Sequence, residues 1–193
     1  FSSATKYFSG HSDVMGGTLA VNKKVFKKIS FFYKLSGYRM SADEAYLIIR
    51  GLRTLDVRLK AHSENTKKII NFLKKQKKIK EILYPHKTSS KNYKLWKKYY
   101  KGATGLLSIV VKSKNKSSVV KFVNSLELFG IGYSWGGFES LAILQELRAS
   151  KDEYSQGRRF FRFSNDEHIV RIHIGLEDPK DLVLDLKNSL KHI

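Results

Sequence analysis

Residues 2–17 decide how this chain is interpreted, and they run Ser2-Ser3-Ala4-Thr5-Lys6-Tyr7-Phe8-Ser9-Gly10-His11-Ser12-Asp13-Val14-Met15-Gly16-Gly17. A single lysine, Lys6, stands between small hydroxyl residues and a loop that glycines punctuate. A neutral lysine amine can attack a carbonyl carbon and form a Schiff base. Ser3 and Thr5 closely precede it, so their hydroxyls could hydrogen-bond an anionic group. The stretch therefore indicates a reactive lysine beside an anion-binding loop.

The same residues allow two other interpretations. Ser3-Ala4-Thr5-Lys6 also fits the Ser-x-x-Lys pattern of serine β-lactamases and penicillin-binding proteins. Those enzymes require later Ser-Asp-Asn and Lys-Thr-Gly sequences, whereas this chain has Ser12-Asp13-Val14 and no Lys-Thr-Gly. Taken alone, the four residues also fit an ordinary surface lysine, so the rest of the chain has to decide.

Length and composition narrow the class of protein. The 193 residues can bury a core of one domain or one and a half. The chain starts at Phe1, inside what looks like a motif, and we therefore expect a fragment that lacks its N-terminal part. The absence of cysteine excludes disulfides and thiolate metal sites and fits a reducing compartment. No apolar run reaches the roughly 18–20 residues of a membrane span, and no signal peptide is visible. We expect a soluble, cytoplasmic protein without a metal site.

The net charge of +20, from 37 basic and 17 acidic residues, raises the expectation of an anionic partner such as nucleic acid. The excess is mostly lysine beside apolar helical stripes, as at Lys23-Lys24 and Lys67-Lys68, which is typical of solvated faces. No helix-turn-helix, zinc-finger, KH or RRM signature appears. We expect no nucleic-acid partner. A basic nucleic-acid-binding module stays the alternative from a different class, and a salt-dependent gel shift would support it.

Hydrophobic periodicity predicts the elements of the first half. A buried strand is expected over 17–22, and an amphipathic helix over 23–35 that ends at Gly37. A capping box of Ser41 and Glu44 opens one long helix that connects two domains. We therefore divide the chain into the end of one domain (1–40), a connecting helix (41–78) and an α/β domain (79–193). The helix carries an apolar stripe and three arginines expected to be solvent-exposed or at an interface: Ala45, Ile48, Leu52, Leu55, Leu59, Ile69, Ile70 and Leu73, with Arg50, Arg53 and Arg58.

The second half has an α/β pattern. Residues 82–85 are expected to form an edge strand closed by Pro85, followed by a loop over 86–90. The basic and aromatic stretch 91–100 could stack on bases, although packing of one helix is the stronger interpretation. A strand over 105–111 precedes a helix over 117–126, and a last helix starts at Asp178-Pro179. The core-facing residues of these two helices are expected to be Val119, Val120, Phe122 and Val123, then Leu182, Val183, Leu186 and Leu190.

A second conspicuous stretch is Gly132-Tyr133-Ser134-Trp135-Gly136-Gly137-Phe138-Glu139-Ser140-Leu141. Paired glycines let backbone approach a ligand closely. Trp135 could form a wall of a site, and Ser134 could donate to a carboxylate. Taken alone, a glycine turn beside a core tryptophan is the stronger interpretation.

The third stretch is His168-Ile169-Val170-Arg171-Ile172-His173-Ile174-Gly175-Leu176-Glu177-Asp178-Pro179. Strand alternation puts Val170, Ile172 and Ile174 on one face and Arg171 and His173 on the other. A buried arginine needs a paired anion, and its planar fork matches a carboxylate. Arg171 is thus a candidate for binding an amino acid, whereas His173 is expected to be a satisfied structural histidine.

Together these three stretches resemble the signatures of the Cys/Met-metabolism enzymes that use pyridoxal phosphate (PLP). Those enzymes show Ser-x-Thr-Lys-Tyr followed by Gly-His-Ser-Asp, then Ser-Leu-Gly-Gly-x-Glu-Ser, then Arg-Leu-Ser-Val-Gly-Leu/Ile-Glu. The chain carries all three blocks in the same order, from Ser2 to its C-terminus. Ser134-Trp135 and Arg171-Ile172-His173 look like the cystathionine β-lyase branch in particular.

The resemblance implies the C-terminal half of an α/β, fold-type-I PLP enzyme of the aspartate aminotransferase kind. It implies that Lys6 binds the cofactor covalently and is the catalytic residue, while Ser3 and Thr5 hold the cofactor phosphate. Arg171 would bind the substrate α-carboxylate, helped by Ser134, with Trp135 lining the site. The family's pyridine-nitrogen aspartate, ring-stacking tyrosine and phosphate loop precede the lysine and are absent from these residues.

The activity implied is β-elimination of cystathionine to homocysteine, pyruvate and ammonia, within methionine biosynthesis and in a homotetramer. The alternatives within the family are cystathionine γ-synthase, cystathionine γ-lyase and methionine γ-lyase. The fragment alone is expected to be inactive, because essential parts of the family's site lie outside it.

Overall fold

The computed structural model describes residues 1–86, 88, 92–145, 163–164 and 166–193. Its centre is a five-stranded sheet with the order β3-β4-β7-β6-β5. All neighbouring pairs are antiparallel except β5 and β6, which run parallel. The strands in chain order are β3 (Ile79–Leu83), β4 (Leu106–Lys112), β5 (Gly130–Ile131), β6 (Leu141–Gln145) and β7 (Glu167–His173).

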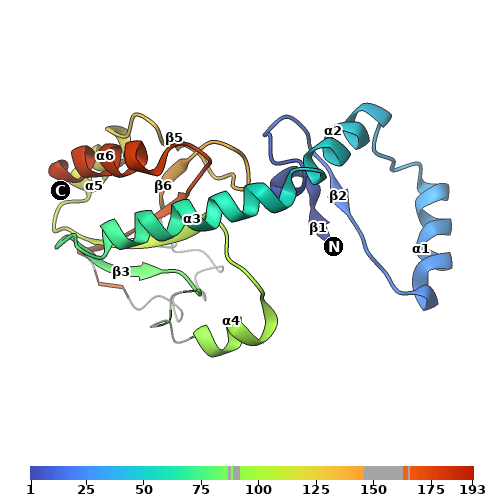
Figure 1. The fold of residues 1–193 in the computed structure, drawn as a ribbon, viewed down its shortest axis with the longest axis horizontal. Helices are drawn as coiled ribbons and strands as arrows, with labels where there is room; N and C mark the ends of the chain where they lie inside the picture. The colour runs from blue at the N-terminus through green and yellow to red at the C-terminus, as the bar shows by residue number, and fades with distance from the viewer. Residues whose placement is uncertain (87, 89–91, 146–162, 165) are drawn as a thin grey trace, which may run out of the picture.

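One face of this sheet carries the main core, against the helices α3 (Leu55–Leu73), α5 (Lys116–Asn124) and α6 (Pro179–Ser189) (Figure 1). The register places Val170 opposite Ile109 and Ile172 opposite Leu107, and all four are buried in one cluster. Strand alternation then puts Arg171 and His173 on the opposite face, as predicted. The sheet thus separates the apolar core from the side that carries these two polar residues.

The predicted elements of the second half are found with small shifts of their ends. Strand β3 lies at the sheet edge, as expected for the segment that Pro85 closes. Asp178 caps α6 through the Lys180 amide and Pro179 is its first residue, so this prediction is confirmed. In α5, Val119, Phe122 and Val123 are buried, whereas Val120 is 38% exposed and does not belong to the core. Val120 points away because it is one residue, about 100°, past the buried position 119.

The expected single helix over 41–78 is wrong, because the segment forms α2 (Ala42–Leu52) and α3 with a break between them. The capping box at Ser41 and Glu44 is present as predicted. At the break Thr54 leaves the helical conformation, with φ −110° and ψ 7°. The Gly51 carbonyl there accepts hydrogen bonds from the Thr54 amide at 3.1 Å and from Arg58 at 2.7 Å. These bonds satisfy the end of α2 and let α3 start in a new direction.

The three arginines were expected to be solvent-exposed or at an interface; Arg50 and Arg53 are exposed, whereas Arg58 is buried within the chain, with 6% of its area exposed. Its guanidinium donates to the carbonyl of Tyr7 at 2.9 Å as well as to Gly51. A Cβ on Gly51 would lie 2.2 Å from the Ser9 carbonyl oxygen, so glycine lets the lysine turn pack against the helix junction. Residues 7–9 are therefore held in place by packing and hydrogen bonds at the α2–α3 junction.

The N-terminal region has little core of its own. Strands β1 (Ser2–Ser3) and β2 (Gly17–Thr18) pair around the lysine turn, and α1 (Lys23–Ser36) follows. The buried strand predicted over 17–22 is wrong, since β2 is two residues long and exposed. Helix α1 forms as predicted, capped by Asn22 and ended by Gly37 at φ 70°. None of its residues is buried, although its face is apolar: Val25, Phe26, Ile29, Phe31, Phe32, Tyr33 and Leu35 are all exposed.

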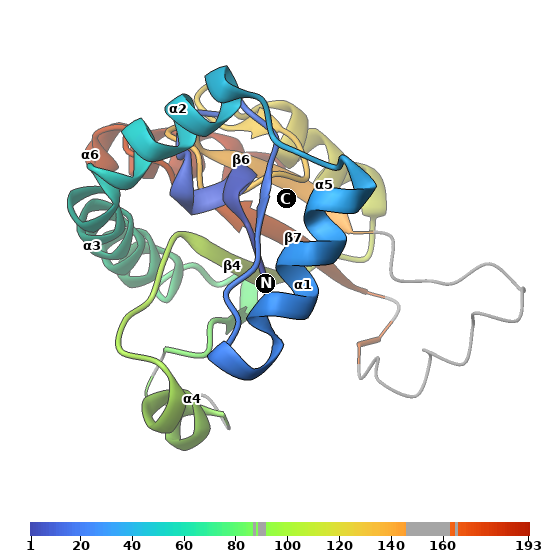
Figure 2. The same cartoon turned by 90° about the vertical axis from the view of Figure 1, so that its right-hand side faces the viewer.

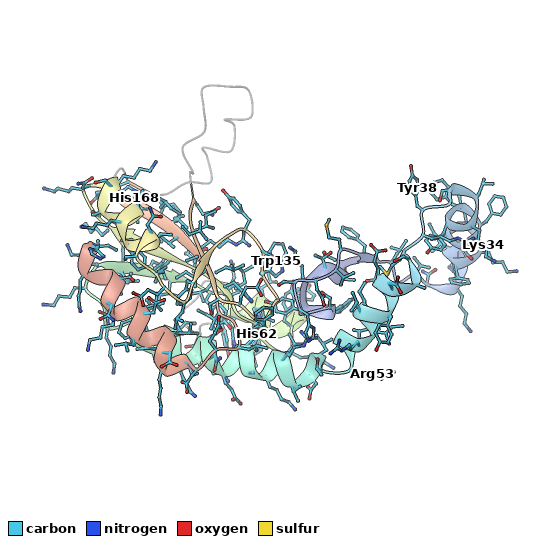
Figure 3. All side chains as sticks on the ribbon, turned by 90° about the horizontal axis from the view of Figure 1, so that it is seen from above. Lys34, Tyr38, Arg53, His62, Trp135 and His168 are labelled. Atoms are coloured by element: carbon cyan, nitrogen blue, oxygen red, sulfur yellow. The ribbon has the colours of Figure 1, made fainter. Side chains whose placement is uncertain are left out.

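Two views place α1 apart from the sheet. Figure 1 shows α1 at one end of the molecule, beyond α2, and Figure 2 looks along the molecule from that end. In Figure 3, Lys34 and Tyr38 lie far from His168, which is on β7. The apolar face of α1 is therefore not covered by any described part of this chain.

The basic and aromatic stretch forms α4 (Tyr93–Tyr99), while Lys91 and most of the expected loop 86–90 lie outside the described residues. The rings of His86 and Trp96 stack at 4.2 Å, and Tyr93 stacks on Trp96 at 5.6 Å. The prediction that the aromatic residues pack this helix is confirmed only for these rings, since no residue of α4 is buried and Tyr99 and Tyr100 are each 65% exposed. No helix in the described parts of the chain combines the length and apolarity needed to cross a membrane.

Candidate functional site

The lysine turn holds Lys6 in a distinct backbone conformation. Residues Ala4–Phe8 form a π-helical turn, in which Lys6 departs from helical geometry with φ −89° and ψ −118°. The Thr5 hydroxyl accepts from the Gly16 amide at 2.8 Å and donates to the Gly16 carbonyl at 3.2 Å. The Gly10 amide closes the turn on the Lys6 carbonyl at 2.8 Å. With Arg58 bound to the next carbonyl, the backbone on both sides of Lys6 is fixed.

The Lys6 side chain reaches residues far along the chain. Its Nζ donates to Ser134 Oγ at 3.0 Å and lies 4.6 Å from the centroid of the Trp135 ring. Ser134 and Trp135 belong to the loop between β5 and β6 (Figure 3). An ammonium at that distance from an indole ring is within range of a cation–π interaction. The first two sequence blocks therefore meet at the amine of Lys6.

Arg171 joins the same group of residues from β7. Its guanidinium donates to the main-chain carbonyl of Tyr133 and, at 3.3 Å, to that of Ser134. Its Cζ lies 5.2 Å from the centroid of the Trp135 ring, so this ring contacts both cations. Four of the predicted site residues, Lys6, Ser134, Trp135 and Arg171, are thus brought together.

The paired glycines bring the loop onto the lysine turn rather than onto a ligand. Gly136 has φ 84°, and a Cβ there would lie 2.8 Å from the amide nitrogen of Tyr7. Next to it, the Glu139 carboxylate accepts from Ser12 Oγ at 2.6 Å. At position 136, only a glycine permits both the positive φ and the close approach to Tyr7. Ser12 and Glu139 were not among the predicted site residues, and neither has a signal in the sequence beyond its place in a block.

A cavity of about 460 Å³ lies beside Lys6, and its lining consists of Thr5, Ser12, Asp13, Val14, Met15, Ser134 and Glu139. Its volume falls in the range of roughly 300–1,000 Å³ that is usual for small-molecule sites. Thr5 thus faces the cavity as predicted for a ligand-binding residue, but its hydroxyl proton is directed to Gly16. Ser3 is exposed on β1 and does not line this cavity.

His173 is a buried structural histidine, but the prediction that it is satisfied holds only for Nε2, because Nδ1 is buried without a hydrogen-bond partner among the described residues. Its Nε2 accepts from the Gly136 amide at 3.0 Å, and only 1% of its area is exposed. Burial is the main cause that lowers the pKa of His173 to about 4, with the neighbouring His62 and Arg171 adding to it. Sequence reasoning missed His62 and Tyr7, which contact this ring. His62 lies within a regular helical pattern, where nothing in the sequence distinguishes a buried histidine.

Among residues 1–86, 88, 92–145, 163–164 and 166–193, no three His, Asp or Glu side chains gather so that they could hold a metal ion. Lys6 and Arg171 place an amine and a guanidinium beside Ser134, which also lines the cavity, whereas the cavity lining itself carries the carboxylates of Asp13 and Glu139. An amine can react with a carbonyl group and a guanidinium can bind a carboxylate.

Comparisons with known proteins agree with this chemistry. The family model described as Cys/Met metabolism PLP-dependent enzyme matches residues 1–191. The chain is 37% identical over 191 residues to a cystathionine beta-lyase of Escherichia coli (strain K12). The matched residues make up 98% of this chain and 47% of that protein. It is 36% identical over 190 residues to an L-alanine/L-glutamate racemase of Wolbachia pipientis wMel, with 98% and 46% covered.

A solved structure agrees with these relatives. The chain matches a crystal structure of cystathionine gamma synthase from Xanthomonas oryzae pv. oryzae, in complex with aminoacrylate and cysteine, with a TM-score of 0.84 and 30% identity. The match covers 98% of this chain and 48% of that one. The chain thus spans about half the length of the relatives that it matches.

Proposed function

Since the chain belongs to the family of Cys/Met metabolism PLP-dependent enzymes, we propose that it forms part of a carbon–sulfur lyase that converts cystathionine to homocysteine, pyruvate and ammonia. Its mixed α/β fold is consistent with the C-terminal half of a fold-type-I PLP enzyme. The observation that carries the proposal is the meeting of Lys6, Ser134, Trp135 and Arg171, which come from three separate segments.

The residues present fit pyridoxal 5'-phosphate, the cofactor that the family implies. An aldehyde needs an amine, and Lys6 offers one that is hydrogen-bonded to Ser134, a residue that lines the cavity of about 460 Å³. Thr5 would bind the phosphate by turning its hydroxyl proton away from Gly16, and Ser3 would assist from β1. When bound, the cofactor supplies an electron sink that stabilises negative charge at the substrate Cα.

Lys6 would also move protons during the reaction. With the cofactor and substrate bound, the Lys6 amine would take the proton from the substrate Cα and would later return it to the leaving sulfur. Ser134 Oγ, 3.0 Å from Nζ, holds the amine in a defined position while this happens. The Trp135 ring, whose centroid is 4.6 Å from Nζ, would shield one side of the amine.

Arg171 would hold the substrate by its α-carboxylate. Its guanidinium donates to main-chain carbonyls through Nη2, which anchors the group beside Trp135 and Ser134. A carboxylate that binds the same fork is oriented as well as attracted, and this selects which bond at Cα reacts. Ser134 would add a hydroxyl donor to the same carboxylate.

The β-lyase assignment rests on finer features than the family. Ser134-Trp135 and Arg171-Ile172-His173 resemble the β-lyase branch, and the 37% identical Escherichia coli protein is a cystathionine beta-lyase. Cystathionine γ-synthase, cystathionine γ-lyase and methionine γ-lyase are the alternatives. The Wolbachia relative adds amino-acid racemisation, which shares the step of removing the Cα proton.

Product analysis with the full-length protein separates these activities. From cystathionine, β-elimination gives homocysteine and pyruvate, whereas γ-elimination gives cysteine and 2-oxobutyrate. L-Alanine incubated in deuterium oxide would reveal racemisation as D-alanine labelled at Cα. We expect pyruvate as the main product from cystathionine. Formation of 2-oxobutyrate from cystathionine instead, or rapid conversion of L-alanine to D-alanine in place of elimination, would overturn the β-lyase assignment.

The cofactor assignment is tested separately. Borohydride reduction of the full-length protein followed by peptide mass mapping should find the cofactor attached to Lys6. Lys6→Ala should abolish turnover, and an adduct on another lysine would contradict the assignment. Arg171→Ala should lower kcat/KM by roughly tenfold to over a hundredfold, since charge-assisted hydrogen bonds contribute about 1.5–3 kcal/mol. Arg171→Lys should recover only part of it, because a point charge cannot reproduce the fork.

We also propose that the full-length protein acts in the cytoplasm as a homo-oligomer, a tetramer by resemblance to its family. The exposed apolar face of α1 supports this, because it needs a cover that the described residues do not provide. Analytical ultracentrifugation of the full-length protein would give the mass directly.

A further inference from the structure

A buried aromatic cluster lies directly behind Lys6, and the proposed reaction does not use it. Tyr7 from the lysine turn, His62 from α3 and His173 from β7 meet with ring centroids 5.7, 6.3 and 5.2 Å apart. His62 and His173 expose 0% and 1% of their areas. Figure 3 labels His62 near Trp135. The cluster joins the three parts of the chain that build the site.

Hydrogen bonds determine where the protons of the two histidines lie. His62 Nδ1 is 2.8 Å from the carbonyl oxygen of Ile174, which can only accept, so Nδ1 carries the hydrogen. His173 Nε2 is 3.0 Å from the amide of Gly136, which can only donate, so this nitrogen carries none. The Gly137 carbonyl lies farther from the same nitrogen, at 3.3 Å. The neutral rings therefore leave Nε2 of His62 as an acceptor and Nδ1 of His173 as a donor.

Those two atoms, and the hydroxyl of Tyr7, are buried without a hydrogen-bond partner among the described residues. A donor and an acceptor in the same small cluster attract each other as long as both rings stay neutral. A proton on either ring would replace this complementary pair with two donors. It would also set His173 Nε2–H against the Gly136 N–H.

Burial is the main cause that favours the neutral form of both histidines, since it lowers the pKa of each. Burial lowers the pKa of His62, Arg58 lowers it further, and the Ile174 carbonyl and Glu177 partly offset both effects. Arg171 disfavours a charge on His173 in the same way. Burial also raises the pKa of Tyr7, whose hydroxyl faces Thr104 and Gly105, so the phenol stays protonated. No group in the cluster is charged near neutral pH.

The bond from Gly136 to His173 has a consequence for the site. Gly136 follows Trp135 and Ser134 in the chain and packs on the peptide between Lys6 and Tyr7. We propose that His173, oriented by His62, is a positioning residue that holds the Gly136 turn against the lysine turn. It thereby fixes Ser134 and Trp135 at the amine of Lys6.

Two amide substitutions of His173 test this proposal in the full-length protein. The Oε1 atom of Gln can reach the position of Nε2 and accept from Gly136, whereas the shorter Asn reaches only the position of Nδ1. The protein would be labelled with 5-fluorotryptophan, and the fluorine resonance of Trp135 assigned by its loss in Trp135→Phe. His168→Asn is the matched control, since His168 lies on the same strand but is bonded to Ser113.

We expect His173→Gln and His168→Asn to keep the Trp135 resonance and kcat/KM close to the parent values. His173→Asn should shift or broaden the resonance and lower kcat/KM by roughly tenfold to a hundredfold, because it leaves the Gly136 amide unpaired. Equal damage in the Gln and Asn variants, or no change in the Asn variant, would overturn the proposal. If His173→Asn does not fold, His173→Met, which also lacks an acceptor for Gly136, takes its place.

The effect on turnover rests on the proposed function, but the resonance does not depend on which substrate is converted. A wrong substrate would leave the spectroscopic difference between the Gln and Asn variants in place. An unchanged Trp135 resonance in His173→Asn would overturn the positioning role alone.

Discussion

The two ends of this molecule are stabilised very differently. Around the five-stranded sheet, strands and helices share one continuous buried core that includes Ile109, Phe122, Ile172 and Leu186. Around the lysine turn, the described buried apolar residues are the small cluster of Ala4, Val14 and Ile48. Beyond it, α1 buries none of its residues. The sheet region can therefore stabilise itself, whereas the N-terminal region depends on its attachments.

The proposed site lies where these two regions meet. Lys6 comes from the weakly packed side, while Trp135 and Arg171 come from loops and strands anchored in the sheet. Polar contacts make much of the attachment: Arg58 binds the Tyr7 carbonyl and Ser12 binds Glu139 across the boundary, while His173 binds Gly136, which packs on the lysine turn. The geometry at Lys6 thus depends on a few hydrogen bonds between the two regions.

The largest expected effect lies in the sheet core. Phe122→Ala should lower the free energy of unfolding by about 3–5 kcal/mol, because a fully buried aromatic side chain is removed and a cavity remains. The matched change in the other region, Phe32→Ala on α1, removes a ring that is 65% exposed and should stay within about 0.5 kcal/mol. Urea unfolding of the 193-residue chain measures both. Similar losses in the two variants would contradict the difference between the regions.

The attachment between the regions comes next. Arg58→Ala should cost about 3 kcal/mol, because it leaves the buried carbonyls of Tyr7 and Gly51 without their charged donor. Arg53→Ala, at the same helix junction but exposed, is the control and should change little. Hydrogen exchange should show that Arg58→Ala exposes the amides of the lysine turn more than those of β4 and β7. An equal loss of protection in the lysine turn and in β4 and β7 would mean that the lysine turn opens only together with the sheet core.

Acid should weaken the same attachment. His173 titrates near pH 6.5 in the unfolded chain and at about 4 in the folded chain, so the unfolded state binds more protons between these values. The contribution of His173 to the free energy of unfolding is fully present above pH 6.5. It decreases as the pH falls towards 4, by on the order of 2 kcal/mol. Unfolding measured at both pH values in the parent and in His173→Gln isolates this effect. An equal pH dependence in both proteins would contradict it.

The smallest effect compares two helix caps of the same kind. Asp178→Ala removes the side-chain acceptor at the start of α6, whose Leu182 and Leu186 are buried, and should cost about 1 kcal/mol of global stability. Asn22→Ala removes the cap of α1 and should leave the global transition unchanged, since α1 buries nothing. Circular dichroism would detect only a local loss of helix in Asn22→Ala. A shift of the main transition would show that α1 is coupled to the core.

Much of the local structure could be predicted from the sequence. The capping box at Ser41, the stop at Gly37 and the start of α6 at Asp178 depend on neighbouring residues in the chain, and all three are present. The alternation in β7 correctly separated Val170 and Ile172 from Arg171. The three sequence blocks also predicted which residues would surround Lys6, because each block keeps its residues within a few positions of one another.

Predictions failed where distant contacts decide. The predicted apolar stripe passes from Leu52 to Leu55 at helical spacing, so it shows no sign of the break, but Arg58 binds the Gly51 carbonyl and the chain bends there. Arg58 itself was expected to be solvent-exposed or at an interface, because arginine in a helical pattern is rarely buried within its own chain. It is buried because the Tyr7 carbonyl, far away in the sequence, lies within its reach.

Interactions among near neighbours in the chain specify most of the elements, their caps and the residue types of the site, but they did not reveal the break between α2 and α3 or the shortness of β2. Only the tertiary structure decided that α1 would be exposed, that His62 and His173 would share a buried cluster, and that Gly136 would rest on the lysine turn. Such contacts depend on which faces meet in space. Periodicity along one segment shows that a face is apolar or polar, but it carries no information about the surface that covers it.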